Sequence, residues 1–577
     1  MYHNLVERSS VSPILTNEDK CTYKALYSQP SVSNDISILS TPFAPNAEQT
    51  QMIQARLQLQ RQKIRQLDRK VPSVECKLSD IEAERNRLMQ SCAVDDALLA
   101  PIRRLHVETL EEIFCMAIPK FSTDELLSDD DANHPYDLEE EHPHRARQRL
   151  RQVCRRWRIV ADQAPRVWTT LALDMSLSDD VSVVDTWLNN SKMCLLDLYI
   201  RPEAWFPEEA EGHQTAILLT RIRSEFRRLR LFFAVIEWID MPCLFPPGLH
   251  SEAPSLEIFA LHSEVRFGLD VHGDTTLIGT VHSPKLTILA LQDMDRAFGA
   301  FTEASYFALR HIAITLSTHP SLNYLSYLVQ CTNLESLNWR DFSESPHIFN
   351  RPPPQMQGIF PSLTTLNFST NPETVGPHLF LGCLNAPALD SLRIDASTIS
   401  GDPGPALSML DSLLGGRAQP SLSNLDLWNA DLTDVVFDDS FRPLVRLESL
   451  NVFGGVMDAS LLKALDPPTD DRPKCCPELR TLTISSVHVL CGADLVQFLR
   501  RRTCSDIDGW RPGYLESATV ETCRGIEPEA THELLGLQET HRSSIILDSS
   551  ETQGSPSPSC LLTVDIYAAV IGGTDIA

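Results

Sequence analysis

Two histidines and a run of carboxylates are the residues whose types and spacing first suggest chemistry in this sequence. His142 and His144 flank Pro143, and the segment 121–142 holds nine Asp and Glu residues. Imidazole and carboxylate groups bind zinc, but a zinc site needs several protein ligands at suitable spacings. No further ligand follows at such a spacing, so we expect no metal here and interpret 121–142 as a solvated acidic insert.

Patterns typical of catalysis are absent from the sequence. It has no Walker loop and no GxGxxG, HExxH or GxSxG motif, and no pair of carboxylates has a spacing that indicates acid–base chemistry. The fifteen cysteines form no CxxC pair, which is typical of reduced thiols buried as small apolar side chains. We therefore expect no catalytic residue, metal or cofactor, and a chain that is not an enzyme.

The composition of the sequence indicates which classes of partner, and which cell compartment, are to be expected. The formal charge is −27 at pH 7, and an acidic chain repels phosphate backbones, so nucleic acid is not an expected partner. The sequence has no run of about eighteen apolar residues and no secretory leader pattern, so no membrane association is expected. These features favour the cytoplasm or the nucleus. A chain of 577 residues is expected to fold as several units.

An apolar stripe with arginines on both sides marks residues 145–161. One helical face carries Leu150, Val153, Cys154, Trp157 and either Val160 or Ala161. Seven arginines flank it: Arg145, Arg147, Arg149, Arg151, Arg155, Arg156 and Arg158. A basic helix can bind nucleic acid or anionic lipid, but we interpret these side chains as the flanks of a packed helix, neutralised by the acidic insert.

Helical patterns also precede this stripe. Residues 1–46 show no period and are interpreted as a disordered leader, whereas 47–92 carry apolar residues at spacings of three and four, such as Leu57, Ile64 and Leu88. Because Pro72 interrupts this pattern, two helices are expected rather than one. They pack as a hairpin or on their own domain, and self-association as a coiled coil is the alternative.

The order of the next motifs resembles a known family. Residues 98–114 read LLAPIRRLHVETLEEIF, residues 153–161 read VCRRWRIVA, and PRVW follows at 165–168. Together, over 98–171, they resemble the F-box-like proteins that are abundant in basidiomycete fungi, in which a coiled coil precedes the motif. The family's Pro-Pro pair is His106-Val107 here, and its Ile before Leu110 is Thr109.

The resemblance implies a function and a set of contact residues. F-box helices bind a Skp1-like adaptor protein of an SCF-type ubiquitin ligase, so the chain would be an adaptor in the ubiquitin conjugation pathway. The implied partner-binding residues are Pro101, Leu105, Leu110, Ile113, Phe114, Val153, Cys154, Trp157 and Trp168. The alternative for these side chains is that they pack only against one another. Loss of the proline pair is expected to loosen the start of the first helix, and Thr109 to remove a buried aliphatic contact.

A repeating frame, Leu-x-x-apolar-x-apolar, fills much of the remaining chain. Nine leading leucines begin clear frames: Leu256, Leu286, Leu309, Leu334, Leu363, Leu389, Leu422, Leu447 and Leu479. They are 23–33 residues apart by subtraction of these positions, and the last two apolar residues of each frame face one side of a strand. One strand and one helix per unit is typical of a leucine-rich repeat. An α/β domain with a parallel sheet is the alternative.

The expected fold is therefore α plus an α/β solenoid. An N-terminal helical coiled coil or hairpin at 47–92 precedes a helical F-box motif at 98–171 and an irregular leucine-rich-repeat solenoid at 190–525, and 543–577 form a poorly ordered tail. In the first functional hypothesis the chain is a substrate-recruiting adaptor whose repeats bind an unknown protein target. In the second it is a non-ligase leucine-rich-repeat interaction scaffold with a degenerate F-box.

Overall fold

A computed structural model describes most of the chain from residue 46 onward. The described residues are 46–70, 78–99, 101–120, 142–174, 181–201, 212–236, 241–263, 279–316, 323–341, 358–370, 381–382, 384–396, 406–414, 421–433, 441, 444–465, 476–489, 492–502, 515–521, 523–524, 526–541, 545–546 and 563–567. Pro72, nearly all of the leader and the acidic insert up to Glu141 lie outside these residues. The chain divides into two compact units: 1–120, 136–171 and 185–194 form the first, and 121–135, 172–184 and 195–577 form the second.

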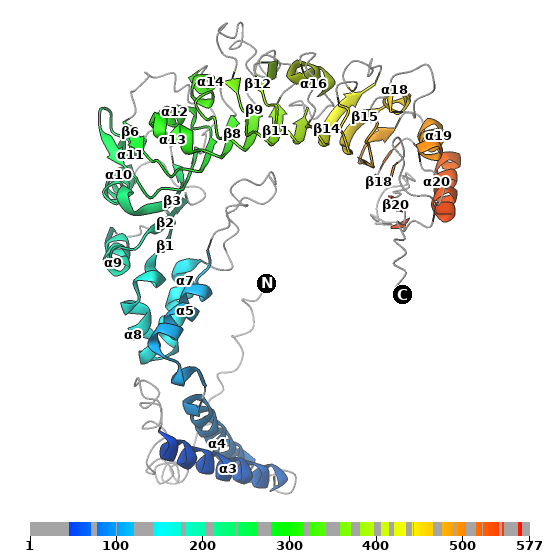
Figure 1. Cartoon of the computed structure of the whole chain (residues 1–577). Coiled ribbons are helices and arrows are strands. Elements are labelled where there is room, and N and C mark those ends of the chain that lie inside the picture. The colour runs from blue at the N-terminus through cyan, green and yellow to red at the C-terminus, as the bar shows by residue number, and fades with distance from the viewer. Residues whose placement is uncertain are drawn as a thin grey trace, which may run out of the picture. The chain divides into compact units, whose positions relative to one another are not determined.

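The first unit begins with a helical hairpin of α3 (Ala47–Lys70) and α4 (Leu78–Leu99) (Figure 1). The two helices run antiparallel, because Gln60 donates to Ser91 at 2.7 Å while Lys63, further along α3, pairs with Glu84, earlier on α4. The expected break into two helices is confirmed. Each helix covers part of the other's apolar stripe within a single chain, through contacts such as those of buried Leu57 and Leu88.

Short helices follow in the first unit. They are η3 (Pro101–Arg104), α5 (Val107–Ala117), α7 (Pro143–Val153), α8 (Arg155–Gln163) and η4 (Pro165–Trp168). Proline at the first position of α7 and of η4 suits a helix start, since the missing amide proton has no helical partner there. We call α5, α7, α8 and η4 the helical module, because α5 and α7 each contact α8, and α5 and α8 also contact η4.

The second unit is built on one large sheet, in which sixteen strands of the described residues take part. The strands are β1 (Thr170–Asp174), β2 (Leu196–Arg201), β3 (Leu229–Ile236), β5 (Ile258–Ser263), β7 (Ile288–Gln292), β8 (His311–Leu316), β9 (Ser336–Asp341), β11 (Thr365–Thr370), β13 (Ser391–Asp395), β14 (Asn424–Leu432), β15 (Ser449–Met457), β16 (Thr481–Ser485), β17 (His488–Val489), β18 (Ser517–Glu521), β19 (Ile545–Ile546) and β20 (Thr563–Tyr567). The pairings from β2 to β18 are parallel, and β20 pairs with β18 and β19 antiparallel.

The leucine frames place the strands correctly. All nine predicted strand positions coincide with strands, from β5 to β16, and neighbouring frames pair in register, as Leu366 of β11 does with Leu337 and Leu392. Frame residues such as Leu392 and Leu425 are fully buried, whereas the residues between them on each strand are half-exposed. One side of the sheet is therefore the apolar core of this unit, and the alternate side chains form its polar face.

The predicted fold class is wrong in its architecture. The structure is an α/β arrangement around one continuous, mostly parallel sheet, the alternative to a helical F-box followed by a leucine-rich-repeat solenoid. The predicted unit of one strand and one helix does not recur regularly along the described chain. The intervals between several strands hold short strands instead, which pair as β4 (His250–Glu252) with β6 (Thr280–His282) and as β10 (Gly358–Ile359) with β12 (Leu384–Asn385).

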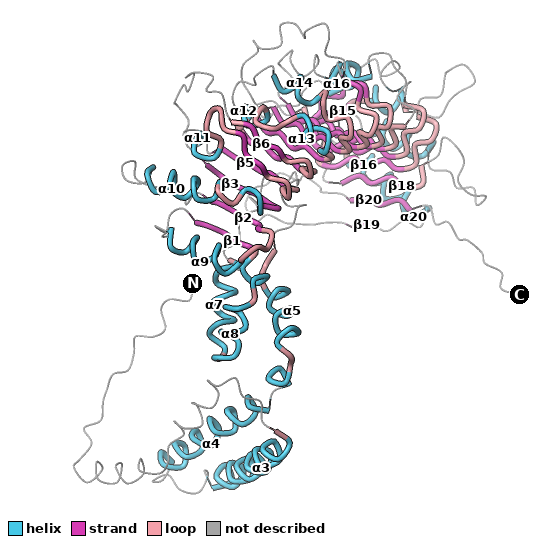
Figure 2. The backbone as a smooth tube through the Cα atoms, turned by 60° about the vertical axis from the view of Figure 1, so that its left-hand side comes forward, coloured by secondary structure: helices cyan, strands magenta, loops and turns pink. Residues whose placement is uncertain are grey.

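Helices cover one side of this sheet, as Figures 1 and 2 show. They include α12 (Asp295–Phe298), α13 (Glu303–Ala308), α14 (Asn323–Leu328), α16 (Ala406–Leu414), α18 (Ala459–Ala464) and α19 (Gly492–Arg502). Six of the nine residues of α16 are buried, and α16 contacts β13 and β14. The remaining described helices are α9 (Val181–Ser191), α10 (Gly212–Arg223), η5 (Phe226–Arg228), α11 (Met241–Leu244) and α20 (Pro528–His541).

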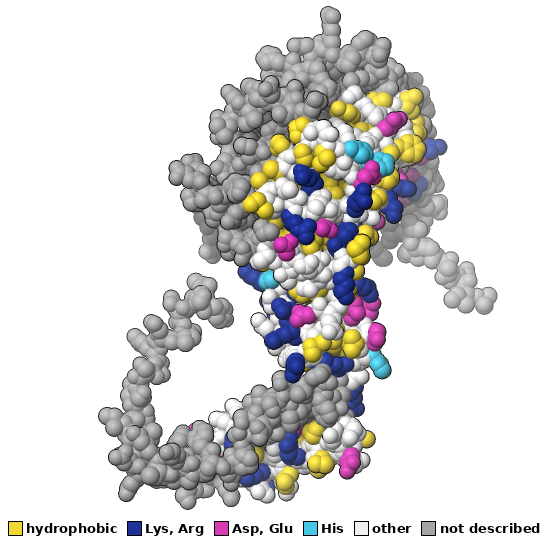
Figure 3. Space-filling model, turned by 90° about the vertical axis from the view of Figure 1, so that its left-hand side faces the viewer, with side chains coloured by type: hydrophobic (Ala, Val, Ile, Leu, Met, Phe, Trp, Pro, Cys, Tyr) yellow, Lys and Arg dark blue, Asp and Glu magenta, His cyan; other side chains and the backbone are white. Residues whose placement is uncertain are grey.

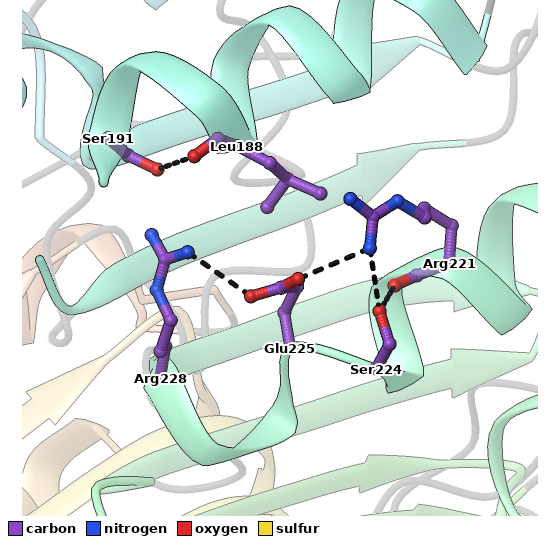
Figure 4. A network of polar contacts seen from close by, with 6 residues as sticks. All are labelled: Leu188, Ser191, Arg221, Ser224, Glu225 and Arg228. Carbon is purple, nitrogen blue, oxygen red and sulfur yellow. Dashed lines mark hydrogen bonds and ion pairs between the residues drawn. The ribbon is translucent and has the colours of Figure 1, made fainter. Parts of the chain in front are cut away.

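A polar network fixes the turn that leads into β3 (Figure 4). Glu225 accepts from Arg221 at the end of α10 and from Arg228 of η5, each at 3.2 Å. Arg221 also donates to the Ser224 hydroxyl at 2.9 Å, and that hydroxyl donates back to the Arg221 carbonyl. In the first unit, the Ser191 hydroxyl likewise donates to the Leu188 carbonyl at 3.0 Å. These contacts satisfy backbone and side-chain groups at helix ends, which is a structural role.

Candidate functional site

The centre of the helical module is an apolar core. Leu110 and Phe114 of α5 are fully buried, and the Phe114 ring lies 4.9 Å from that of Trp157 of α8. Trp168 is buried as well, and its indole Nε1 donates to the carbonyl of Ala161 at 2.7 Å. Three of the predicted partner-binding residues, Leu110, Phe114 and Trp168, thus pack against their own module.

A buried arginine holds α7 against the chain that follows α8. The Arg147 Nη1 atom donates to the carbonyl of Thr170 at 2.5 Å and to that of Val167 at 3.3 Å, and its guanidinium lies over the Trp168 ring. Burial lowers the pKa of Arg147 to about 10, so it remains protonated near neutral pH. The sequence interpretation placed Arg147 among the flanking arginines. Its spacing of three from Leu150 was the signal that it shares the buried face.

The other predicted contact residues remain accessible to a partner. Pro101 is exposed, and Val153 has 57% of its surface exposed at the end of α7. Four more are half-buried: Leu105, Ile113, Cys154 and Trp157. The predicted partner-binding residues therefore include some that form the core of the module and some that lie on its surface. The helical stripe in the sequence could not separate these two groups.

Sequence reasoning missed three exposed apolar residues of the same module. Met116 is 77% exposed, Val107 50% and Ile159 37%. On α5, Met116 lies three residues after Ile113 and seven after Thr109, so these three share one strip of the helix surface. We define the apolar surface of the module as Ile113, Met116, Val153 and Ile159; Val107 lies on the opposite face of α5 from Met116, which is nine residues further along, and is not part of it. The spacing from Ile113 to Met116 was the signal that could have found this strip.

The two departures from the F-box pattern were expected to loosen a helix start and to remove a buried contact. Neither effect is seen in the structure. Helix α5 begins at Val107, the second position of the missing proline pair, and His106 has a φ of −62°, the value that proline itself adopts. The start of α5 is thus formed without those prolines. Thr109 is exposed, so its hydroxyl replaces no buried contact. The effect of Thr109 falls on the apolar surface, where it lies at the N-terminal end of the strip on α5.

Two residues whose side chains could bind a metal or act as a nucleophile, His142 and Cys154, serve as helix caps. His142 is the N-cap of α7, where its Nδ1 accepts from the His144 amide at 3.2 Å. Cys154 is the N-cap of α8, and its Sγ accepts from the Trp157 amide at 3.5 Å. Burial, with Arg147 and Arg151 nearby, lowers the pKa of His144, which favours the neutral imidazole. Among the described residues, no three His, Cys, Asp or Glu side chains are grouped to hold a metal ion.

Two of the described cysteines, Cys331 and Cys523, are poor nucleophiles because burial raises the pKa of their thiols. The cysteines that the structure describes are free. Burial raises the pKa of Cys331 to about 12 and that of Cys523 to about 11. A thiolate is the reactive form of cysteine, and these two groups stay protonated near neutral pH.

A second cluster lies on the polar face of the sheet in the second unit. The Arg393 guanidinium of β13 lies 4.0 Å from the centre of the Trp428 ring of β14, and Trp428 in turn packs at 4.5 Å on Phe453 of β15. All three side chains are half-exposed. Nearby, the Asn451 amide donates to the Asp426 carboxylate at 2.7 Å. Arginine and large aromatic side chains on a polar face are the residue types that dominate protein interfaces.

Kinks in two strands fix this stacked cluster. Trp428 pairs with Phe453 in register, and pairing resumes at Ala430 and Gly455 beyond the kink. Gly454 and Gly455 have φ values of +69° and +81°, in the left-handed region that favours glycine. A Cβ atom on Gly455 would lie 2.2 Å from the Ala430 carbonyl oxygen, so the two backbones approach too closely for a side chain.

Comparison with known proteins gives no family for the chain. No protein-family model and no curated protein matches the sequence. In the described parts of the chain, no helix has the length and apolar character needed to span a membrane.

Proposed function

We propose that the chain is an F-box-type adaptor that recruits a protein target to an SCF-type ubiquitin ligase. The observation that carries this proposal is the apolar surface of the helical module, where Met116 and Val153 are more than half exposed around a well-packed core. Exposed apolar side chains that a partner covers are typical of a protein-binding surface. A Skp1-like protein would cover this surface, and other subunits would transfer ubiquitin, so the chain itself needs no catalytic group, metal or cofactor.

The stacked cluster of Arg393, Trp428 and Phe453 supports a second role in the same proposal. It offers a polar sheet face with aromatic anchors to a protein target, on a different unit from the apolar surface. An adaptor needs two separate surfaces of this kind, one for the ligase and one for the target. Such a ligase would operate in the cytoplasm or the nucleus.

One observation favours the second candidate function, a scaffold without a ligase. Thr109 places a hydroxyl at the N-terminal end of the exposed strip on α5, beside positions that a partner would cover. A buried hydroxyl without a hydrogen-bond partner opposes binding by roughly 1–3 kcal/mol. Thr109→Ile is therefore expected to strengthen the interaction with a Skp1-like protein. If only this variant binds and the natural chain does not, the scaffold function is the correct one.

Met116→Glu is expected to weaken binding of a Skp1-like protein by about tenfold or more, since a carboxylate would lose its water in an apolar contact. Calorimetric titration of the full chain with the purified Skp1-like protein measures this change. Met52→Glu on α3 is the matched control, because Met52 is 67% exposed on a helix outside the module. Equal affinities for the natural chain and Met116→Glu would refute the assignment of this surface. Leu110→Asp is not a usable test, because Leu110 is fully buried and its replacement would unfold the module.

A further inference from the structure

The charge of the helical module is opposite to that of the chain as a whole. From residue 143 to 168 the sequence holds eight arginines and one acidic residue, Asp162, a net charge of +7 in a chain of −27. Figure 3 shows Lys and Arg side chains beside hydrophobic ones on the helical part of the molecule. A segment of such contrasting charge indicates an interaction that the rest of the chain does not require.

Several of these arginines have structural partners. Arg147 is buried, Arg151 pairs with Asp162 at 2.8 Å, and Arg166 pairs with Glu112 of α5. Arg149 and Arg155 are different: both are exposed, and neither forms an ion pair with any residue that the structure describes. Arg158 is also exposed, and its Nε donates to a backbone carbonyl rather than to a carboxylate.

These arginines border the apolar surface of the module. Arg149 lies four residues before Val153 on α7, and Arg155 lies four residues before Ile159 on α8. Residues four apart are neighbours on a helix surface, so Val153 and Ile159 each have an exposed arginine beside them. Apolar groups bordered by arginine form the usual composition of a protein–protein interface.

The position of Arg155 is unfavourable for the helix that carries it. Arg155 is the first residue of α8, and the first turn of that helix contains no acidic residue. The N-terminal end of a helix bears partial positive charge, which stabilises carboxylates and destabilises cations. Folding alone would favour an acidic residue here, so the arginine points to a role outside the fold.

We propose that the helical module docks an acidic segment of a partner protein, whose carboxylates meet Arg149, Arg155 and Arg158 while its apolar side chains cover Val153 and Ile159. This inference rests on the proposed function and names the chemistry of the adaptor that the module binds. A protein segment fits better than a nucleic acid, because exposed Val153 and Ile159 lie beside the arginines and a phosphate backbone offers no apolar side chains to cover them.

The test compares the natural chain with the double variant Arg149→Glu/Arg155→Glu. The probes are a purified Skp1-like protein, poly-L-glutamate and a single-stranded RNA. The matched control is Arg65→Glu/Arg69→Glu, which reverses two exposed charges on α3. At low salt, the association rates with the Skp1-like protein and with poly-L-glutamate are expected to fall by about tenfold or more in the double variant and not in the control. High salt is expected to lower the same rates for the natural chain. Hydrogen exchange of α8 is expected to slow in Arg155→Glu, because the helix end gains a favourable charge.

The outcomes separate this inference from the proposed function. Binding of poly-L-glutamate that needs both arginines supports the inference even if the Skp1-like protein fails to bind. Binding of the Skp1-like protein that is unaffected by the double variant refutes the inference and leaves the proposed function intact. Preferential binding of RNA overturns the inference. A second result would also overturn it: poly-L-glutamate that binds only after the carboxylates of 121–141 are replaced by amides. The acidic segment that occupies the arginines would then be the chain's own.

Discussion

Phe114→Ala is expected to lower the free energy of unfolding of the helical module by about 3–5 kcal/mol, the range for removing a buried phenylalanine. Phe114 is fully buried and its ring packs on Trp157, which ties α5 to α8. Without that ring, a cavity would remain between two short helices. The change should also abolish partner binding, because the apolar surface exists only while α5 and α8 are held together.

Native-state hydrogen exchange of α5 and α8 in the full chain measures this loss. Met116→Ala is the control on the same helix, and it should change stability by less than about 0.5 kcal/mol because Met116 is largely exposed. An equal loss in the two variants would mean that Phe114 does not hold the module together.

Gly455→Ala is expected to destabilise the sheet around β14 and β15 by about 3 kcal/mol or more. The new Cβ would combine a left-handed backbone conformation with close contacts to the backbone of Ala430, and backbone atoms cannot rotate away as a flexible side chain can. The kink would have to shift, and the stacking of Trp428 on Phe453 would change with it. Any target that docks on this cluster should bind less tightly as a consequence.

A second glycine separates the two causes of this effect. Gly248 has a similar φ of +73°, but a Cβ atom there would meet nothing within 4 Å. Gly248→Ala should therefore show only the conformational penalty, roughly 1–2 kcal/mol. Hydrogen exchange over residues 424–432 and 449–457 reports the Gly455 effect. Equal destabilisation by both substitutions would show that the close approach to Ala430 contributes nothing.

The strands could be predicted from the sequence, but their assembly could not. A frame such as Leu389, Leu392 and Ile394 specifies a strand with one buried face, because its last two apolar residues are two apart. The same frame is satisfied by a stacked repeat or by a continuous sheet with irregular connections. The intervals decide between them, and segments such as 250–252 and 280–282 form strand pairs that carry no leucine frame.

The candidate site could be predicted only in part. The helical stripe at 145–161 includes Trp157, which packs on Phe114, but it also includes Val153, which is exposed. Arg147 shows the reverse case. Its charged side chain can be buried because two backbone carbonyls accept hydrogen bonds from it. Tertiary contacts of this kind depend on η4 and the start of β1, some twenty residues away, and helical periodicity does not encode them.

The most direct test of the proposal is the hydrogen-exchange footprint of a Skp1-like protein on the full chain. We expect amide exchange to slow in α5, at the end of α7 and in α8, around Met116, Val153 and Ile159, while the sheet strands β13–β15 remain unchanged and available to a target. A footprint confined to the second unit, or a folded chain that shows no protection in the presence of saturating partner, would contradict the account.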